Sequence, residues 1–210
     1  MLRPIRLVIF DLDGTLTQID SLWRHIHDAF GTWDQGKLTS QRYMHGEISY
    51  KEWAETDARS WAGVSMSEIR KVLDGVQYTV GAKEVFEELR RRNVKTAILS
   101  AGLTILADKA LRDLKADYAL ANELRTNDGH LTGEIVVKVA VDNKVAMIDE
   151  IAGVFNVPLH EVALVGDRYF DLSKPECLKI AYKPKDDIAK QTADVIVLDD
   201  DMRTILQYLI

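Results

Sequence analysis

Short apolar runs alternate with helical segments along this chain, and this alternation restricts its possible folds more than any other feature. Candidate strands occupy residues 7–10, 94–99, 118–121, 162–165, 178–181 and 195–198. Several of these runs are apolar throughout instead of alternating, which is typical of strands buried on both faces of a parallel sheet. Between them, apolar residues recur at helical spacing within 82–89, 103–114 and 145–155. The pattern predicts an α/β fold with a doubly wound parallel sheet and right-handed crossovers.

Two segments depart from this alternation. About 60 residues after the first strand contain no strand-like run but three helical patterns, within 19–30, 50–61 and 66–73, which predicts a small helical insertion. We therefore expect a core domain at 1–16 and 77–210, and a cap domain at 17–76. The second departure is the Asn127-Asp128-Gly129 sequence between short polar and apolar runs, which predicts a hairpin within 124–137. All four tryptophans lie in the insertion, where they could form its core or stack on a ligand (Trp23, Trp33, Trp53 and Trp61).

Composition excludes several functional classes. The 210 residues are 47% hydrophobic and 29% charged, as in ordinary globular domains, and the formal net charge is −6. A net negative charge disfavours binding to nucleic acid or to an anionic membrane, and no apolar run approaches the roughly 20 residues needed to span a bilayer. The single cysteine, Cys177, excludes an internal disulfide and a cysteine zinc cluster. We expect a cytoplasmic monomer or homodimer with no nucleic-acid or membrane partner.

Two carboxylates follow the first strand directly. Asp11 and Asp13 stand two residues apart before Gly14, so on an extended chain their side chains point the same way. They would project beyond the carboxyl end of a central strand, where open α/β sheets bind ligands. Two such close negative charges favour a bound cation, and hard oxygen ligands favour Mg²⁺. A solvated strand end without function is the alternative.

Four other polar residues also lie near the ends of predicted strands and helices. Ser100 precedes a helix, where it could bind an anion or simply cap that helix. Lys144 opens another helix and could reach a phosphate, or could be an exposed helix lysine. Asp167 and Asp171 follow the strand at 162–165. The parallel sheet would bring all of these groups to one edge.

In order, these residues resemble the four motifs of the haloacid dehalogenase superfamily. The matching positions are Asp11-Leu12-Asp13-Gly14-Thr15, Ser100, Lys144, and Gly166-Asp167 with Asp171. The Ser100-Ala101-Gly102 loop and the hairpin followed by Leu131-Thr132-Gly133 are most similar to the phosphoserine phosphatase-like branch. The resemblance covers residues 5–209 and implies a Rossmann-like core with a helical cap inserted after the first strand.

The resemblance also implies a mechanism, that of a Mg²⁺-dependent phosphatase acting on a small phosphorylated metabolite. Asp11 would be the nucleophile that forms an aspartyl-phosphate, and Asp13 the general acid and base. The metal would be held by the carboxylates of Asp11 and Asp167 and the backbone carbonyl of Asp13. Phosphoryl oxygens would be bound by Ser100, the Ala101 backbone N–H and Lys144, while Asp171 would orient Lys144 or metal-bound water.

The chain departs from the family pattern at two places. Arg168-Tyr169-Phe170 replaces a small polar run, so Arg168 could take over part of its role or point to solvent. Asp20 stands where the family binds the amino group of phosphoserine. Asp57 falls where the family's cap arginine is expected and would face inward. An inward Asp57 would repel the carboxylate of phosphoserine and favour a polyhydroxyl or cationic leaving group.

Two rival functions share this fold. A phosphosugar mutase would use the same nucleophile but return the phosphoryl group to its substrate. A regulatory protein that binds a phosphorylated ligand would have lost turnover altogether, and the altered run at 168–170 motivates that alternative.

Overall fold

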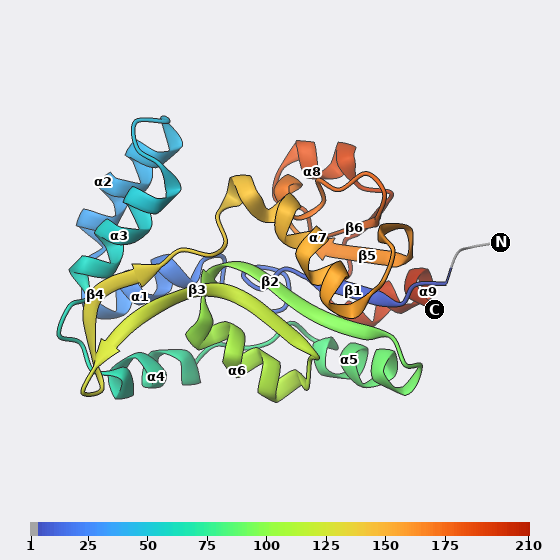
Figure 1. The fold of residues 1–210 in the computed structure, drawn as a ribbon, viewed down its shortest axis with the longest axis horizontal. Coiled ribbons are helices and arrows are strands. Elements are labelled where there is room, and N and C mark those ends of the chain that lie inside the picture. Colours follow the sequence, from blue (N-terminus) through green and yellow to red (C-terminus); the bar gives the residue numbers. More distant parts are fainter. Residues whose placement is uncertain (1–3) are drawn as a thin grey trace.

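A seven-stranded sheet forms the centre of the structure, a computed structural model that describes residues 4–210 (Figure 1). Residues 1–3, at the start of the expected core domain, lie outside the described residues. The strand order is β4-β3-β2-β1-β5-β6-β7; β3 and β4 are antiparallel and all other neighbours are parallel. The strands are β1 Leu7–Phe10, β2 Lys95–Leu103, β3 Tyr118–Asn127, β4 His130–Val136, β5 Val162–Gly166, β6 Leu178–Tyr182 and β7 Val195–Val197.

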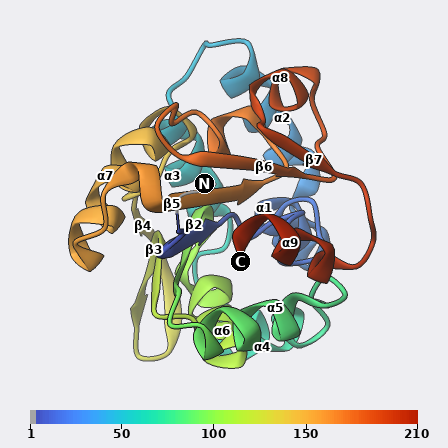
Figure 2. The ribbon, with the colours of Figure 1, turned by 90° about the vertical axis from the view of Figure 1, so that its right-hand side faces the viewer.

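Helices cover both faces of this sheet, as Figure 2 shows for α5 and α6 on one side and α7 on the other. In β1, Val8 and Phe10 belong to the apolar cluster that contains α5 and α6, while Leu7 and Ile9 belong to the cluster with α7. Both faces of the strand are therefore buried, which explains its continuous apolar run and confirms the doubly wound fold. The helices are α5 Ala82–Arg91, α6 Thr104–Leu114, α7 Lys144–Phe155, α8 Asp187–Thr192 and α9 Leu206–Leu209.

The segment 17–76, here called the cap segment, contains four helices where three were expected. They are α1 Leu22–Phe30, α2 Trp33–Met44, α3 Tyr50–Ser60 and α4 Met66–Asp74. Ser21, Ser49 and Ser65 cap α1, α3 and α4 with side-chain hydrogen bonds, the usual role of serine at this position. The sequence missed α2 because its fully buried residues are Gly36 and Thr39, so it shows no apolar stripe.

The predicted hairpin is confirmed as β3 and β4, and it extends further than its sequence suggested. Its far end contacts the cap segment: Gly63 N–H donates to the carbonyl of Leu131, and Leu131 N–H donates to the carbonyl of Val64, both at 2.8 Å. In Figure 1 the long strands reach the ends of α3 and α4. The hairpin therefore links the sheet to the cap segment, although the division into a core and a cap domain stays a prediction.

Among residues 4–210, none of the helices combines the length and the hydropathy required to cross a membrane.

Candidate active site

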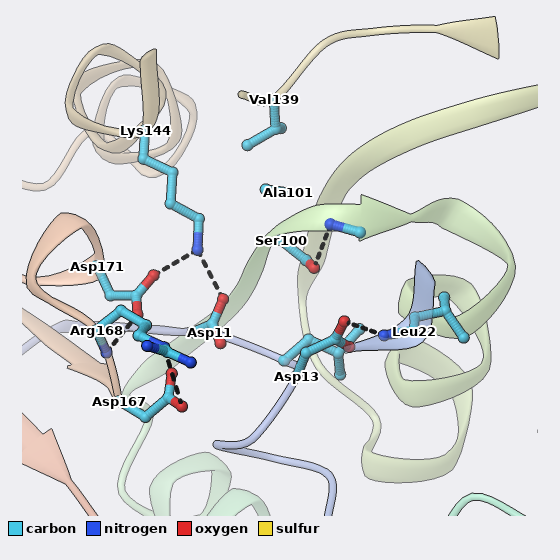
Figure 3. Close-up of polar contacts among 12 residues, drawn as sticks. Asp11, Asp13, Leu22, Ser100, Ala101, Val139, Lys144, Asp167, Arg168 and Asp171 are labelled. Atoms are coloured by element: carbon cyan, nitrogen blue, oxygen red, sulfur yellow. Dashed lines mark hydrogen bonds and ion pairs between the residues drawn. The ribbon is translucent and has the colours of Figure 1, made fainter. Parts of the chain in front are cut away.

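Side chains from three separate parts of the chain meet at the carboxyl edge of the sheet (Figure 3). Asp11 follows β1, Asp167 follows β5, Asp171 ends a 3₁₀ turn at Tyr169–Asp171, and Lys144 is the first residue of α7. Because β1 and β5 are adjacent and parallel, their ends lie side by side. One carboxylate oxygen from each of the three aspartates lies within 4.8 Å of the other two.

Lys144 holds two of these carboxylates. Its side chain is buried, and Nζ donates to Asp11 Oδ1 at 2.6 Å and to Asp171 Oδ1 at 2.5 Å. Burial lowers the pKa of Lys144, but the charges of Asp11 and Asp171 outweigh this effect and raise it above its usual value. Lys144 is therefore a buried ammonium, and its interpretation as an exposed helix lysine is wrong.

Asp11, Asp167 and Asp171, here called the acidic cluster, carry more negative charge than the Lys144 ammonium can balance. Burial, followed by the charge of Asp11, raises the pKa of both Asp167 and Asp171 above the usual range for a carboxyl. In addition, Asp13 Oδ1 and Asp167 Oδ1 are buried with no hydrogen-bond partner among residues 4–210. Buried carboxylate oxygens of this kind need a cation or a proton. Their hard oxygen character fits Mg²⁺, so the residues present fit the expected metal.

Asp13 lies beside this cluster in a different environment. Its Oδ2 accepts a hydrogen bond from the backbone N–H of Leu22, at the start of α1, at 2.7 Å. Burial raises the pKa of Asp13 to about 7, and this outweighs the hydrogen bond from Leu22, which lowers it. Two aspartates only two residues apart therefore have distinct surroundings, which is how sites separate a nucleophile from an acid.

Ser100 lies inside β2 and does not cap α6. The strand continues to Leu103 through an irregularity after Leu99, and Leu103 precedes α6 without a side-chain cap. Ser100 Oγ instead accepts a hydrogen bond from Gly102 N–H at 2.9 Å. The Ser100 hydroxyl proton can therefore point to a ligand while the loop stays folded. The helix-capping alternative for Ser100 is wrong.

The loop at Ala101 is fixed by residues that the sequence did not single out. The Ala101 carbonyl accepts hydrogen bonds from Trp23 Nε1 at 3.3 Å, from the Tyr50 hydroxyl, and from Asn122 Nδ2 at 2.9 Å. Asn122 is fully buried, and its Oδ1 also accepts from the backbone N–H of Lys138 and Val139. An asparagine directly after the apolar run at 118–121 was the available signal for this role.

Comparison with known proteins identifies the family of this site. A family model described as haloacid dehalogenase-like hydrolase matches residues 8–173. The chain belongs to this family. It is 30% identical to the phosphoserine phosphatase of Methanocaldococcus jannaschii over the full length of both proteins. It is 31% identical to that of Archaeoglobus fulgidus, over 91% of this chain and 56% of the relative.

Solved structures of similar proteins agree with this assignment. A substrate-bound phosphoserine phosphatase complex has a TM-score of 0.84 and 27% identity, and covers 99% of this chain and 100% of its own. A phospho-aspartyl intermediate analogue of a phosphoserine phosphatase has a TM-score of 0.83 and 28% identity, with the same coverage. The expected enzyme class, a phosphatase similar to the phosphoserine phosphatases, is confirmed.

In this haloacid dehalogenase-like hydrolase, a cavity of about 310 Å³ lies between the acidic cluster and the cap segment. Trp23 and Trp53 line it, whereas Trp33 and Trp61 pack around the His27 ring. Trp23 also stacks on Trp61 in the apolar core, so it packs the cap segment as well as reaching the cavity wall. The cavity is lined by Asp11, Asp13, Asp20, Ser21, Trp23, Ser40, Tyr43, Met44, Tyr50, Trp53, Ser100, Ala101, Gly102, Val141, Lys144, Asp167, Arg168 and Phe170.

The two acidic residues expected to select the leaving group both contact basic side chains. Asp57 faces inward as expected, but its Oδ2 lies 3.1 Å from His27 Nε2 inside the cap segment and it does not line the cavity. The structure therefore does not support a repulsion between Asp57 and the substrate. Asp20 lines the cavity, and its exposed carboxylate accepts a hydrogen bond from Lys185 Nζ.

Proposed function

We propose that this protein is a Mg²⁺-dependent phosphomonoesterase that acts through an aspartyl-phosphate on Asp11. The observation that carries this proposal is the placement of Asp11: its carboxylate is held by Lys144 and lies beside Asp13, whose pKa is about 7. An Asp11 oxygen would attack phosphorus as the bond from phosphorus to the leaving oxygen breaks. Water would then cleave the aspartyl-phosphate, releasing phosphate and restoring the Asp11 carboxylate.

Asp13 supplies the proton transfers of both steps. With a pKa near neutral pH, a large fraction of Asp13 is protonated before reaction, so it can protonate the leaving alkoxide. The resulting carboxylate can then accept a proton from the attacking water. Its hydrogen bond to Leu22 N–H keeps one oxygen in place and leaves the partnerless Oδ1 for the substrate.

Charge on the phosphoryl group is balanced by groups of this chain. The Lys144 ammonium, the Ser100 hydroxyl and the Ala101 backbone N–H would bind its oxygens, and Asp171 would hold Lys144 in position. Asp11 and Asp167 would hold Mg²⁺ together with the Asp13 carbonyl. When bound, the metal would reduce the repulsion between the anionic nucleophile and the phosphate.

The substrate would be a small phosphorylated metabolite, and phosphoserine is one candidate. Its support is the similarity to proteins named phosphoserine phosphatase. Asp20 would bind the amino group of such a substrate after leaving Lys185. A cytoplasmic location, expected from the single cysteine, belongs to the same proposal.

The decisive experiment measures the free phosphate released from p-nitrophenyl phosphate and phosphoserine, with and without Mg²⁺. An acid quench of the same reactions traps any protein that carries radiolabelled phosphate. Wild type should release phosphate only with Mg²⁺ and carry radiolabelled phosphate on Asp11. Asp11→Asn should lose at least about 10³-fold in kcat and carry no label. Asp149→Asn is the matched control, because Asp149 is an exposed partner of Lys174 outside the cavity.

Three results would contradict the proposal. Full turnover by Asp11→Asn would exclude Asp11 as the nucleophile. Phosphate release without trapped label under single-turnover conditions would favour direct attack by water. Absence of free phosphate with every substrate would favour the mutase or the binding protein.

A further inference from the structure

The leaving-group side of the cavity contains an unusual distribution of charge. The cap segment contributes Asp20, Ser21, Ser40 and Met44 together with four aromatic side chains, and no lysine, arginine or histidine. Of the basic residues that the structure describes, Lys144 and Arg168 line the cavity, and both come from outside the cap segment. Among the residues that line the cavity, only Lys144 and Arg168 could therefore form an ion pair with an anionic group on the leaving alcohol.

Lys144 is not available for this purpose. Its ammonium donates to Asp11 and to Asp171 and is almost completely buried. Arg168 differs, because its side chain is 42% exposed and its Nε lies 4.0 Å from Asp167 Oδ2, beyond hydrogen-bond distance. Within the described part of the chain, its guanidinium forms no hydrogen bond. Figure 3 shows this guanidinium beside Asp167, next to the acidic cluster.

The backbone of Arg168 is fixed by two hydrogen bonds, whereas its guanidinium, among the described residues, makes only the long ion-pair contact with Asp167. Its N–H donates to Asp171 Oδ2 at 3.0 Å, and its carbonyl accepts from Asp171 N–H at 3.2 Å. Asp171 is the residue that also binds Lys144. The base of the Arg168 side chain is thus positioned relative to the phosphoryl site, while its guanidinium lies at the cavity wall near Asp167 without a hydrogen bond to any described residue.

We propose that Arg168 is a specificity-determining residue that binds a carboxylate on the leaving-alcohol part of the substrate. The proposal rests on the function proposed above. A carboxylate in a cavity with aromatic walls is costly unless it is paired. The planar guanidinium matches a carboxylate in a bidentate arrangement, which neither a lysine nor a hydroxyl can reproduce. The site would accordingly take the phosphate ester of a hydroxy acid or of a hydroxy amino acid.

Phosphoserine and phosphoethanolamine test this role because they differ only in the carboxylate. The measurement is the ratio of their kcat/KM values, with p-nitrophenyl phosphate as an independent substrate. Wild type should prefer phosphoserine by at least about tenfold, as expected for one charge-assisted pair. Arg168→Gln should reduce this ratio to within about threefold of unity, mainly by raising KM for phosphoserine. Arg168→Lys should restore the preference only in part.

Arg125→Gln is the matched control and should leave the ratio unchanged. Arg125 is half-exposed on the β3–β4 hairpin, where it pairs with Glu123 outside the cavity. An equal fall for both substrates in Arg168→Gln would overturn the proposal and assign Arg168 to the phosphoryl group. Equal or absent turnover of the two by a wild type that hydrolyses p-nitrophenyl phosphate would also overturn it. Failure of wild type to hydrolyse p-nitrophenyl phosphate as well would instead refute the proposed function.

Discussion

At the scale of single residues, buried charge is the property that most needs a tertiary explanation. Asp57 and His27 are both almost fully buried in the cap segment, and they contact each other. His27 Nδ1 also lies 2.7 Å from the Thr32 hydroxyl. A charge without a partner in such a place costs several kcal/mol. The pair therefore explains why an aspartate is tolerated on the inward face of α3, and it gives Asp57 a structural role.

Removal of this carboxylate should destabilise the protein. We expect Asp57→Asn to lower the free energy of unfolding by about 3 kcal/mol, because His27 loses its charged partner inside the cap segment. Asp28→Asn, which breaks the half-exposed pair with Arg24 on the surface of α1, should cost less than about 1 kcal/mol. Urea denaturation measures both. Equal losses in the two variants would show that the buried pair contributes nothing special.

At the scale of elements, the end of β5 determines where Asp171 and Lys144 meet. Gly166 ends this strand, and a Cβ there would lie 2.7 Å from Asp171 Cγ and overlap the Asp171 Cβ. The 3₁₀ turn can therefore pack Asp171 against the strand only because residue 166 has no side chain. Asp171 in turn reaches the first residue of α7. The contact between the end of β5, the 3₁₀ turn and the start of α7, here called the β5–α7 contact, therefore sets the position of the Lys144 ammonium.

A methyl group at the β5–α7 contact should lower the activity more than it lowers the stability of the protein. Gly166→Ala should displace Asp171 and Lys144, and we expect kcat to fall by about 10- to 100-fold. Gly153→Ala is the control, since a Cβ at this position of α7 meets no atom within 4 Å. That change should keep kcat and stabilise the protein by about 0.5–1 kcal/mol. Steady-state kinetics measures kcat and thermal unfolding measures stability in both variants. Full activity in Gly166→Ala would show that the β5–α7 contact does not set the position of Lys144.

At the scale of the whole molecule, the cavity exists because the cap segment packs against the carboxyl edge of the sheet. The contacts between them include the β3–β4 hairpin against residues 63–66, the hydrogen bond from Leu22 to Asp13, and the hydrogen bonds of Trp23 and Tyr50 to Ala101. The contacts with Ala101 lie next to Ser100. Movement of the cap segment would therefore reach the loop proposed to bind the phosphoryl group directly, through the Ala101 carbonyl.

Metal binding should stabilise the whole molecule. A cation that binds the folded acidic cluster and not the unfolded chain stabilises it by mass action, by about 2.7 kcal/mol at 100 times its Kd. We expect Mg²⁺ to raise Tm in wild type and to raise it much less in Asp167→Asn. Asp187→Asn, which changes an exposed carboxylate on α8, should respond like wild type. Sodium chloride of matched ionic strength is the reference. A shift of equal size in Asp167→Asn would place the metal elsewhere.

The local pattern of apolar residues was sufficient to predict the main strands and helices and the polar residues that follow the strands. Apolar runs and helical stripes depend on neighbours in the chain, so β1, β5, α5, α6 and α7 could be predicted. Asp11, Asp13 and Asp167 were found for the same reason: they follow buried strands, and parallel strands end at a common edge. The resemblance to a known family added the roles expected of Ser100 and Lys144.

Tertiary structure alone decided how the buried polar groups are paired. His27 meets Asp57, Asn122 meets Ala101, and Lys185 meets Asp20, in each case from distant parts of the chain. The helix α2 and the continuation of β2 through Ser100 were missed because neither carries a periodic apolar signal. A hydrogen bond or ion pair needs two groups at a defined distance, and that distance is set by packing of whole elements. Neighbours along the chain are therefore enough to predict which side chains gather at the strand ends, whereas the packing of whole elements sets which of the buried charges are paired.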